Sequence, residues 1–177
     1  TSGFRWTTLE EPYELVSTLK RLLGGVHDGA AEDPGGAESA PAVGGTGAAE
    51  VIVVDCLTLW LSNWLLRYER HIDMPELVLG KVNELVRAVG DPRFSGGRAA
   101  RDPSGGPHVL FVTNEVGDGI VPEYPLGRHF RDLAGMMNQR LAAVCDQVFL
   151  VTCGIPMELK SRAFRLMSDG SEPAGNG

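Results

Sequence analysis

Short apolar runs that end abruptly in polar residues predict two buried strands, Val51 to Val54 and Val109 to Val112. Each run has four residues and is rich in β-branched side chains, which favours a strand over a helix. A third run, Val148 to Val151, has the same character. Because a helical pattern lies between the second and third runs, their order predicts a strand-helix-strand unit with parallel strands.

The helical pattern between those runs has apolar residues at intervals of three and four, which form one stripe facing the core. This stripe consists of Leu126, Phe130, Leu133, Met137, Leu141 and Val144. We expect the helix to end near Asp146. A second stripe carries Arg128, Asp132, Gly135 and Asn138. Small and hydrogen-bonding side chains suit close contact with a subunit or a ligand, and an ordinary exposed face is the alternative.

Residues 6–23 are predicted to form the first helix of the chain. Thr7 or Thr8 is expected to cap its N-terminus, and Glu10 and Glu11 then fall in the first turn. Acidic groups there interact favourably with the positive end of the helix dipole. On the pattern alone, Glu10 therefore serves the helix and not a ligand.

Two further helices are predicted over residues 57–68 and 74–89. The tryptophans of the first, Trp60 and Trp64, fall at core spacing, so we expect them to pack in the interior. Asn63 lies within the same apolar face and requires either a buried partner or a ligand.

Polar residues directly after two predicted strands suggest a binding site. In an open parallel sheet, the residues beyond the carboxyl ends of the strands face the crevice where ligands bind. Asn114 and Glu115 occupy that position after the second strand, and Asp55 occupies it after the first. Four apolar residues followed by Asp form the Walker B pattern, in which the carboxylate holds magnesium directly or through water. The alternatives are a solvated polar turn and an ordinary strand that ends in Asp.

Two stretches of low complexity interrupt the pattern, at residues 24–49 and 90–107. They contain too little apolar surface to offset the entropy of ordering them, so we expect flexible insertions. Residues 1–160 are predicted to form a single α/β domain, and residues 161–177 a loose tail. Lys160 closes the domain and is expected to extend to solvent, with a phosphate contact as the alternative.

Charge and cysteine content narrow the class of protein. The 177 residues carry a formal net charge of −7 and contain no block of Lys or Arg, which excludes the electrostatic footprint of nucleic-acid binding. Three cysteines in apolar surroundings indicate buried reduced thiols. No apolar run approaches the roughly 20 residues that cross a bilayer. We therefore expect a soluble, cytoplasmic protein without a membrane span.

Three separated segments, in the same order, resemble one family. They are Trp6-Thr7-Thr8-Leu9-Glu10, the segment from Val51 to Asn63, and the string TNEVGDGIVPEYPLGRHFRDLAGMMNQRLAAVCDQVFLVTCGIPMELK. The chain is similar in these segments to the bifunctional adenosylcobinamide kinase/adenosylcobinamide-phosphate guanylyltransferases of adenosylcobalamin synthesis.

This resemblance implies a nucleotide-binding domain with a RecA-like P-loop NTPase fold. Such a fold has a mostly parallel sheet with helices on both faces, and the family assembles as a homotrimer. The implied activity uses ATP or GTP, with Mg²⁺, to phosphorylate adenosylcobinamide. GMP is then transferred from GTP through a guanylylated histidine, which yields adenosylcobinamide-GDP.

The resemblance also implies roles for individual residues. Glu10 and Asp55 are expected to bind nucleotide, with Asp55 also holding Mg²⁺. A second group is expected to line the corrinoid side of the site or a subunit seam; it consists of Asn114, Glu115, Arg128 and Asp132.

The sequence contains no Gly-x-x-x-x-Gly-Lys-Ser/Thr string, and no histidine in it matches the guanylylated one. We therefore expect an N-terminally truncated chain that lacks the P-loop strand and is inactive and unstable alone, because a parallel sheet is buried on both faces. One alternative is a non-catalytic paralogue that binds corrinoid or joins the oligomer. Another is an unrelated P-loop ATPase subunit.

Overall fold

The computed structural model describes residues 6–23, 51–91 and 108–164. The chain divides into two compact units, with the boundary between Val144 and Cys145. The elements of the first unit, in chain order, are α1 (Leu15–Leu23), β1 (Val51–Asp55), α2 (Leu57–Tyr68), α3 (Met74–Gly90), β2 (His108–Val112) and α4 (Pro125–Val144). The second unit contains β3 (Phe149–Thr152), β4 (Ile155–Glu158) and the short 3₁₀ helix η1 (Lys160–Arg162).

The first two predicted strands are confirmed as β1 and β2, and they pair in parallel. β1 and β2 pair in register from Val51 opposite His108 to Asp55 opposite Val112. Successive side chains of a strand point to opposite faces, and among the described residues only one face of this pair packs against the core. The inward-facing side chains are Ile52, Val54, Val109 and Phe111. The outward-facing apolar side chains, each between 41% and 49% exposed, are Val51, Val53, Leu110 and Val112.

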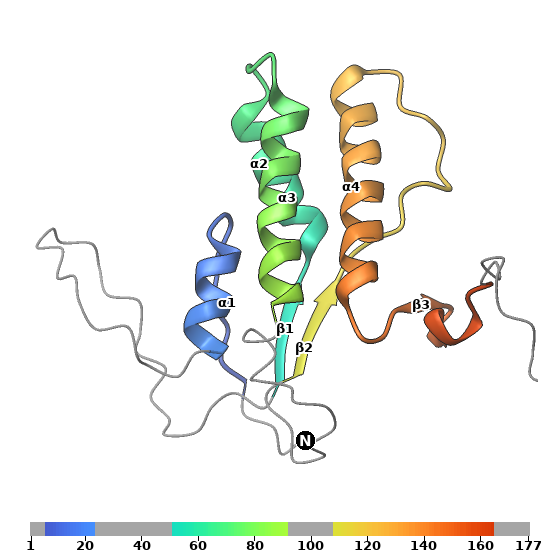
Figure 1. Cartoon of the computed structure of the whole chain (residues 1–177). Coiled ribbons are helices and arrows are strands. Elements are labelled where there is room, and N and C mark those ends of the chain that lie inside the picture. The colour runs from blue at the N-terminus through green and yellow to red at the C-terminus, as the bar shows by residue number, and fades with distance from the viewer. Residues whose placement is uncertain (1–5, 24–50, 92–107, 165–177) are drawn as a thin grey trace, which may run out of the picture. The chain divides into compact units, whose positions relative to one another are not determined.

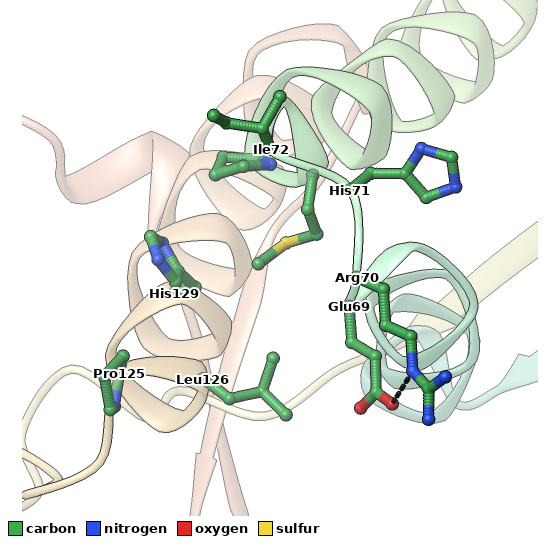
Figure 2. A pocket seen from close by; sticks show the side chains of 9 residues that line it. Glu69, Arg70, His71, Ile72, Pro125, Leu126 and His129 are labelled. Atoms are coloured by element: carbon green, nitrogen blue, oxygen red, sulfur yellow. Dashed lines mark ion pairs between the residues drawn. The ribbon is translucent and has the colours of Figure 1, made fainter.

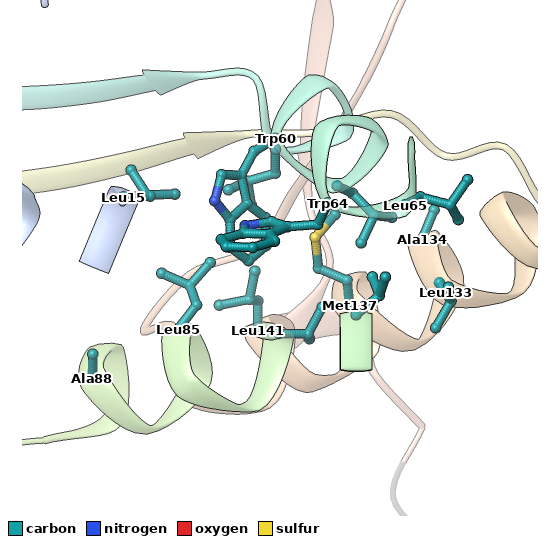
Figure 3. Close-up of a cluster of buried hydrophobic side chains, with 14 of the residues drawn as sticks. Leu15, Trp60, Trp64, Leu65, Leu85, Ala88, Leu133, Ala134, Met137 and Leu141 are labelled. Carbon is teal, nitrogen blue, oxygen red and sulfur yellow. The ribbon is translucent and has the colours of Figure 1, made fainter. Parts of the chain in front are cut away.

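Helices α2, α3 and α4 pack side by side, and most of their length extends beyond the carboxyl ends of β1 and β2 (Figure 1). Their apolar stripes meet in a core whose side chains interdigitate (Figure 3). Trp60 and Trp64 are buried in it, as predicted. The Nε1 group of Trp60 donates a hydrogen bond to the carbonyl of Tyr13 over 3.0 Å, and Asn63 Nδ2 donates to the carbonyl of Pro12 over 3.2 Å. The partner that Asn63 requires is therefore backbone just before α1.

The prediction for the first helix was wrong at its N-terminus. α1 begins at Leu15, and residues 6–10 are not helical. Pro12 explains the difference, because a proline restricts the residue before it and lacks an N–H for the helix. The Glu11 carboxylate accepts hydrogen bonds from the backbone N–H groups of Tyr13 and Glu14 instead. Neither Thr7 nor Thr8 caps the helix, and Glu10 lies outside it.

The predicted order of strand, helix and strand is confirmed by β2, α4 and β3, and the second unit adds a further strand. β3 pairs with β4 in an antiparallel hairpin, which was not predicted from the sequence. Cys153 and Gly154 form its two-residue turn with φ values of 53° and 78°, as the tight turn of a hairpin requires. At the far end of the hairpin, Glu158 accepts hydrogen bonds from the N–H groups of Val148, Lys160 and Ser161.

Several smaller predictions have mixed outcomes. All three cysteines are free, but none is fully buried: Cys56 and Cys145 are half-buried, and Cys153 is exposed. Lys160 Nζ does not simply extend to solvent, because it donates to the carbonyl of Cys145.

No helix in the described ranges is long and apolar enough to cross a membrane. Residues 24–50, 92–107 and 165–177 lie outside the described residues, so the predicted insertions and tail stay predictions.

Candidate functional site

Polar side chains from three elements meet at the carboxyl ends of β1 and β2. The Thr58 hydroxyl, in the first turn of α2, donates to Asn114 Oδ1 over 2.9 Å. Its oxygen lies 2.9 Å from Cys56 Sγ, so the thiol serves as the donor in that contact. Asn114, directly beyond β2, is thereby linked to the end of β1 and to the start of α2.

The middle of α4 completes this network through Asn138. Its Nδ2 group donates to the backbone carbonyl of Asn114 over 3.1 Å. Its Oδ1 atom accepts a hydrogen bond from the Thr113 hydroxyl over 2.8 Å. One amide side chain of α4 therefore holds two consecutive residues at the exit of β2.

Farther along, two arginines of α4 hold the loop of residues 113–124 by its backbone. Arg131 donates to the carbonyl of Gly117. Arg128 donates to the carbonyls of Pro122 and Glu123, over 3.1 and 2.6 Å. Within the loop, Glu115 Oε1 accepts from the N–H of Gly117 over 3.0 Å. Arg128 and Arg131 thus fix the path of this loop.

The structure brings some of the predicted site residues together. Asn114 and Glu115 are consecutive, exposed residues of the held loop, and Asp55 stands on the neighbouring strand opposite Val112. Arg128 is engaged with loop carbonyls. Asp132 is exposed one turn later on α4.

Three predicted carboxylates make no side-chain hydrogen bond or ion pair within the described part of the chain. These are Glu10, Asp55 and Asp132. Glu10 is exposed in the irregular segment before α1, and no hydrogen bond joins it to Asp55. Their availability to a ligand is consistent with the predicted roles, which stay predictions.

A shallow cavity of about 510 Å³ lies elsewhere in the first unit (Figure 2). It is formed by the turn between α2 and α3 and by the start of α4, and its lining includes His71, Ile72 and His129. The 12 residues of α2 separate this turn from the end of β1, a helix length of about 18 Å. None of the predicted site residues lines the cavity.

Two members of the site were not predicted from the sequence, and a third was named without a role in the site. Thr58 and Arg131 were not proposed, and Asn138 was recognised only as part of a polar stripe. Thr58 had a local signal, because it lies three residues after the strand-end Asp55 and inside an otherwise apolar face. Arg131 had none, since its partner is a backbone carbonyl.

The donor set at the strand ends fits a magnesium ion only in part. The described residues contain no cluster of three or more His, Cys, Asp or Glu side chains that can hold a metal. Mg²⁺ is commonly held by one or two carboxylates while water and substrate phosphates complete its coordination. The exposed carboxylate of Asp55 suits that arrangement as a single protein ligand.

Comparison with known proteins identifies a common family. Residues 37–159 match the family model described as CobU, cobinamide kinase / cobinamide phosphate guanyltransferase. The chain is 39% identical over 111 residues to the bifunctional adenosylcobalamin biosynthesis protein CobU of Escherichia coli, which is 63% of this chain and 59% of that protein. It is 33% identical over 155 residues to the corresponding protein CobP of Pseudomonas aeruginosa, 88% of this chain and 66% of the relative.

The matched region includes the whole network at the strand ends, from Asp55 to Asn138. The chain spans about three fifths to two thirds of the length of these relatives. On the extent of the family match, the chain belongs to the cobinamide kinase / cobinamide phosphate guanyltransferase family.

Proposed function

We propose that the protein to which this chain belongs phosphorylates adenosylcobinamide with ATP or GTP and then transfers GMP from GTP to the product. The reaction yields adenosylcobinamide-GDP for adenosylcobalamin synthesis. The observation that carries the proposal is the family match over residues 37–159, which includes the polar network at the ends of β1 and β2. The relatives that support it are both described as bifunctional.

The proposal includes a RecA-like P-loop fold with a larger, mostly parallel sheet covered by helices on both faces. Two observations support it. β1 and β2 are parallel, and parallel sheets are normally buried on both sides. Their outward face nevertheless carries four partly exposed apolar side chains, which suits a face that further elements cover. We also propose a homotrimer and a cytoplasmic location.

Roles for the residues follow from their surroundings. Asp55 is proposed to hold Mg²⁺, which when bound offsets the charge of the nucleotide phosphates. Glu10 is proposed to contact the guanine nucleotide. Asn114 and Glu115 are proposed to face the substrate, and Asp132 the corrinoid side or a subunit seam. We propose that Arg128 acts on substrate binding indirectly, because both hydrogen bonds of its side chain hold the loop that carries Asn114 and Glu115.

Kinetics of the full-length protein test this proposal. With adenosylcobinamide, ATP or GTP, and Mg²⁺, we expect formation of the phosphate and then of adenosylcobinamide-GDP. Asp55→Ala should abolish magnesium-dependent turnover, whereas Asp73→Ala should retain it. Asp73 is a matched control because it is exposed and its side chain does not cap α3.

Two results would contradict the proposal at different points. Unchanged turnover in Asp55→Ala would refute the magnesium role of that residue. Binding of adenosylcobinamide by the wild-type protein without any turnover would favour a non-catalytic corrinoid-binding protein.

A further inference from the structure

The orientation of the Asn114 side chain is fixed by its neighbours. Its Oδ1 atom accepts the Thr58 hydroxyl over 2.9 Å. Asn138 holds the segment around it, because its Nδ2 group donates to the Asn114 backbone carbonyl and its Oδ1 atom accepts from the Thr113 side-chain hydroxyl. Since Thr58 is 8% exposed, its hydrogen bond to Asn114 is shielded from competing water. Both the main chain and the amide plane of Asn114 are thus constrained.

This arrangement determines which groups Asn114 can offer to a ligand. An Asn side chain has one acceptor oxygen and one nitrogen with two N–H donors. Because Thr58 occupies the oxygen, the nitrogen is the end that is available, and it has no hydrogen-bond partner among the described residues. Asn114 is exposed. It therefore offers N–H donors at the surface beyond the strand ends, and such donors bind oxygen acceptors and not cations.

Asn114 differs in this respect from the acidic residues around it. Asp55 on the adjacent strand and Glu115 next in the chain present carboxylate oxygens, which accept hydrogen bonds and bind cations. For a substrate that carries an oxygen acceptor and an associated metal ion, the carboxylates suit the metal ion. The amide N–H groups of Asn114 suit the acceptor oxygen.

Resting on the function proposed above, we propose that Thr58 and Asn138 are positioning residues. They hold Asn114 so that its amide N–H groups donate to an acceptor oxygen of a substrate bound at the ends of β1 and β2. The oxygen belongs either to a phosphate of the nucleotide or to the hydroxyl or phosphate of the corrinoid. These two sources share one chemistry, and the kinetics separate them.

Asn114→Asp is the decisive variant. It keeps the oxygen that accepts the Thr58 hydroxyl, but it replaces the outward N–H groups with a negatively charged oxygen. We expect the KM for one of the two substrates, nucleotide or adenosylcobinamide, to rise about 10-fold to 100-fold, as loss of a hydrogen bond to a charged group does. The midpoint of thermal unfolding should not fall, because the internal hydrogen bond is retained.

Substitutions at Thr58 test the positioning role. Thr58→Val preserves shape but removes the hydroxyl, so the amide is free to turn. The same KM should then rise about threefold to tenfold. Thr58→Ser should restore it. In the double variant Asn114→Asp with Thr58→Val, the two effects should not add, because both act through one side chain. Gln139→Ala, an exposed position on α4, is the matched control and should leave both KM values unchanged.

The outcomes distinguish this inference from the proposed function. If the wild-type protein is active and Asn114→Asp leaves both KM values unchanged, the donor role is refuted. If the wild-type protein shows no turnover, the proposed function fails. Calorimetric titration with GTP and with adenosylcobinamide then decides the donor role: weaker binding by Asn114→Asp supports it, and equal binding overturns it. A wild-type protein that binds neither ligand overturns both.

Discussion

Replacing Leu61 by alanine tests the packing of the helical layer. Leu61 is 0% exposed on the inner side of α2, among the buried residues of the core. The substitution removes three carbon groups, worth about 0.8 kcal/mol each in transfer free energy, or about 2.4 kcal/mol together. The cavity that remains adds to this loss, so we expect the free energy of unfolding to fall by about 3–4 kcal/mol.

Leu59 on the same helix supplies the matched control. Its side chain is 64% exposed, so Leu59→Ala loses only about a third of the transfer free energy, or about 0.9 kcal/mol. The higher helix propensity of alanine offsets part of that loss. The two variants thus compare the same chemical change, two residues apart, in a buried and an exposed environment.

Urea unfolding followed by tryptophan fluorescence measures both variants, because Trp60 and Trp64 are buried in the same core. At an m-value of about 2 kcal/mol/M, the midpoint for Leu61→Ala should fall by about 1.5–2 M urea. The midpoint for Leu59→Ala should shift by less than about 0.5 M. Equal shifts for the two variants would refute the assignment of the core. A loss for Leu59→Ala that depends on protein concentration would instead place Leu59 in a subunit contact.

Two further predictions concern α4 and the hairpin. A Cβ atom at Gly127 would lie 2.7 Å from the ring of Tyr124 and 2.8 Å from Pro122 Cβ, so Gly127→Ala should destabilise the protein by about 1–3 kcal/mol in thermal unfolding. Gly135→Ala meets no atom within 4 Å and should stabilise the same helix by up to about 1 kcal/mol; the opposite order would contradict the close approach of the 113–124 loop to α4. Hydrogen bonds from the Ser161 hydroxyl and N–H, and from the N–H groups of Val148 and Lys160, lower the pKa of Glu158 from 4.5 to about 2. This contribution to hairpin stability should be complete above about pH 4.5 and lost as the pH falls toward 2, and a carboxyl ¹³C titration with a midpoint near 4.5 would contradict it.

The helices with clear apolar periodicity were predicted closely from the sequence. The observed bounds of α2 are those predicted, and α3 and α4 differ from prediction by a residue or two. Packing determines these elements, and packing is visible in the sequence as spacing. The start of α1 was missed because the local effect of Pro12 outweighs the apolar pattern.

The second hairpin strand and the polar network were not predictable in the same way. β4 contains Pro156 in a segment of four residues, which hides a strand because proline lacks a donor for the ladder. The hydrogen bond between Thr58 and Asn114 joins positions 56 residues apart. No local pattern predicts such a pair, since it depends on the register between β1 and β2. The strand-end rule indicated the correct region, but not the residues that organise it.

The parallel register of β1 and β2 also affects the order in which the first unit assembles. Val51 pairs with His108, so the strands meet only after a long stretch of chain has been brought into place. By contrast, α2 and α3 are joined by the short turn at residues 69–73 and pack against each other. Local contacts form before distant ones because loop closure costs entropy. We therefore expect the helical hairpin to form before the strands pair, and Asn114 to gain its partners late in folding.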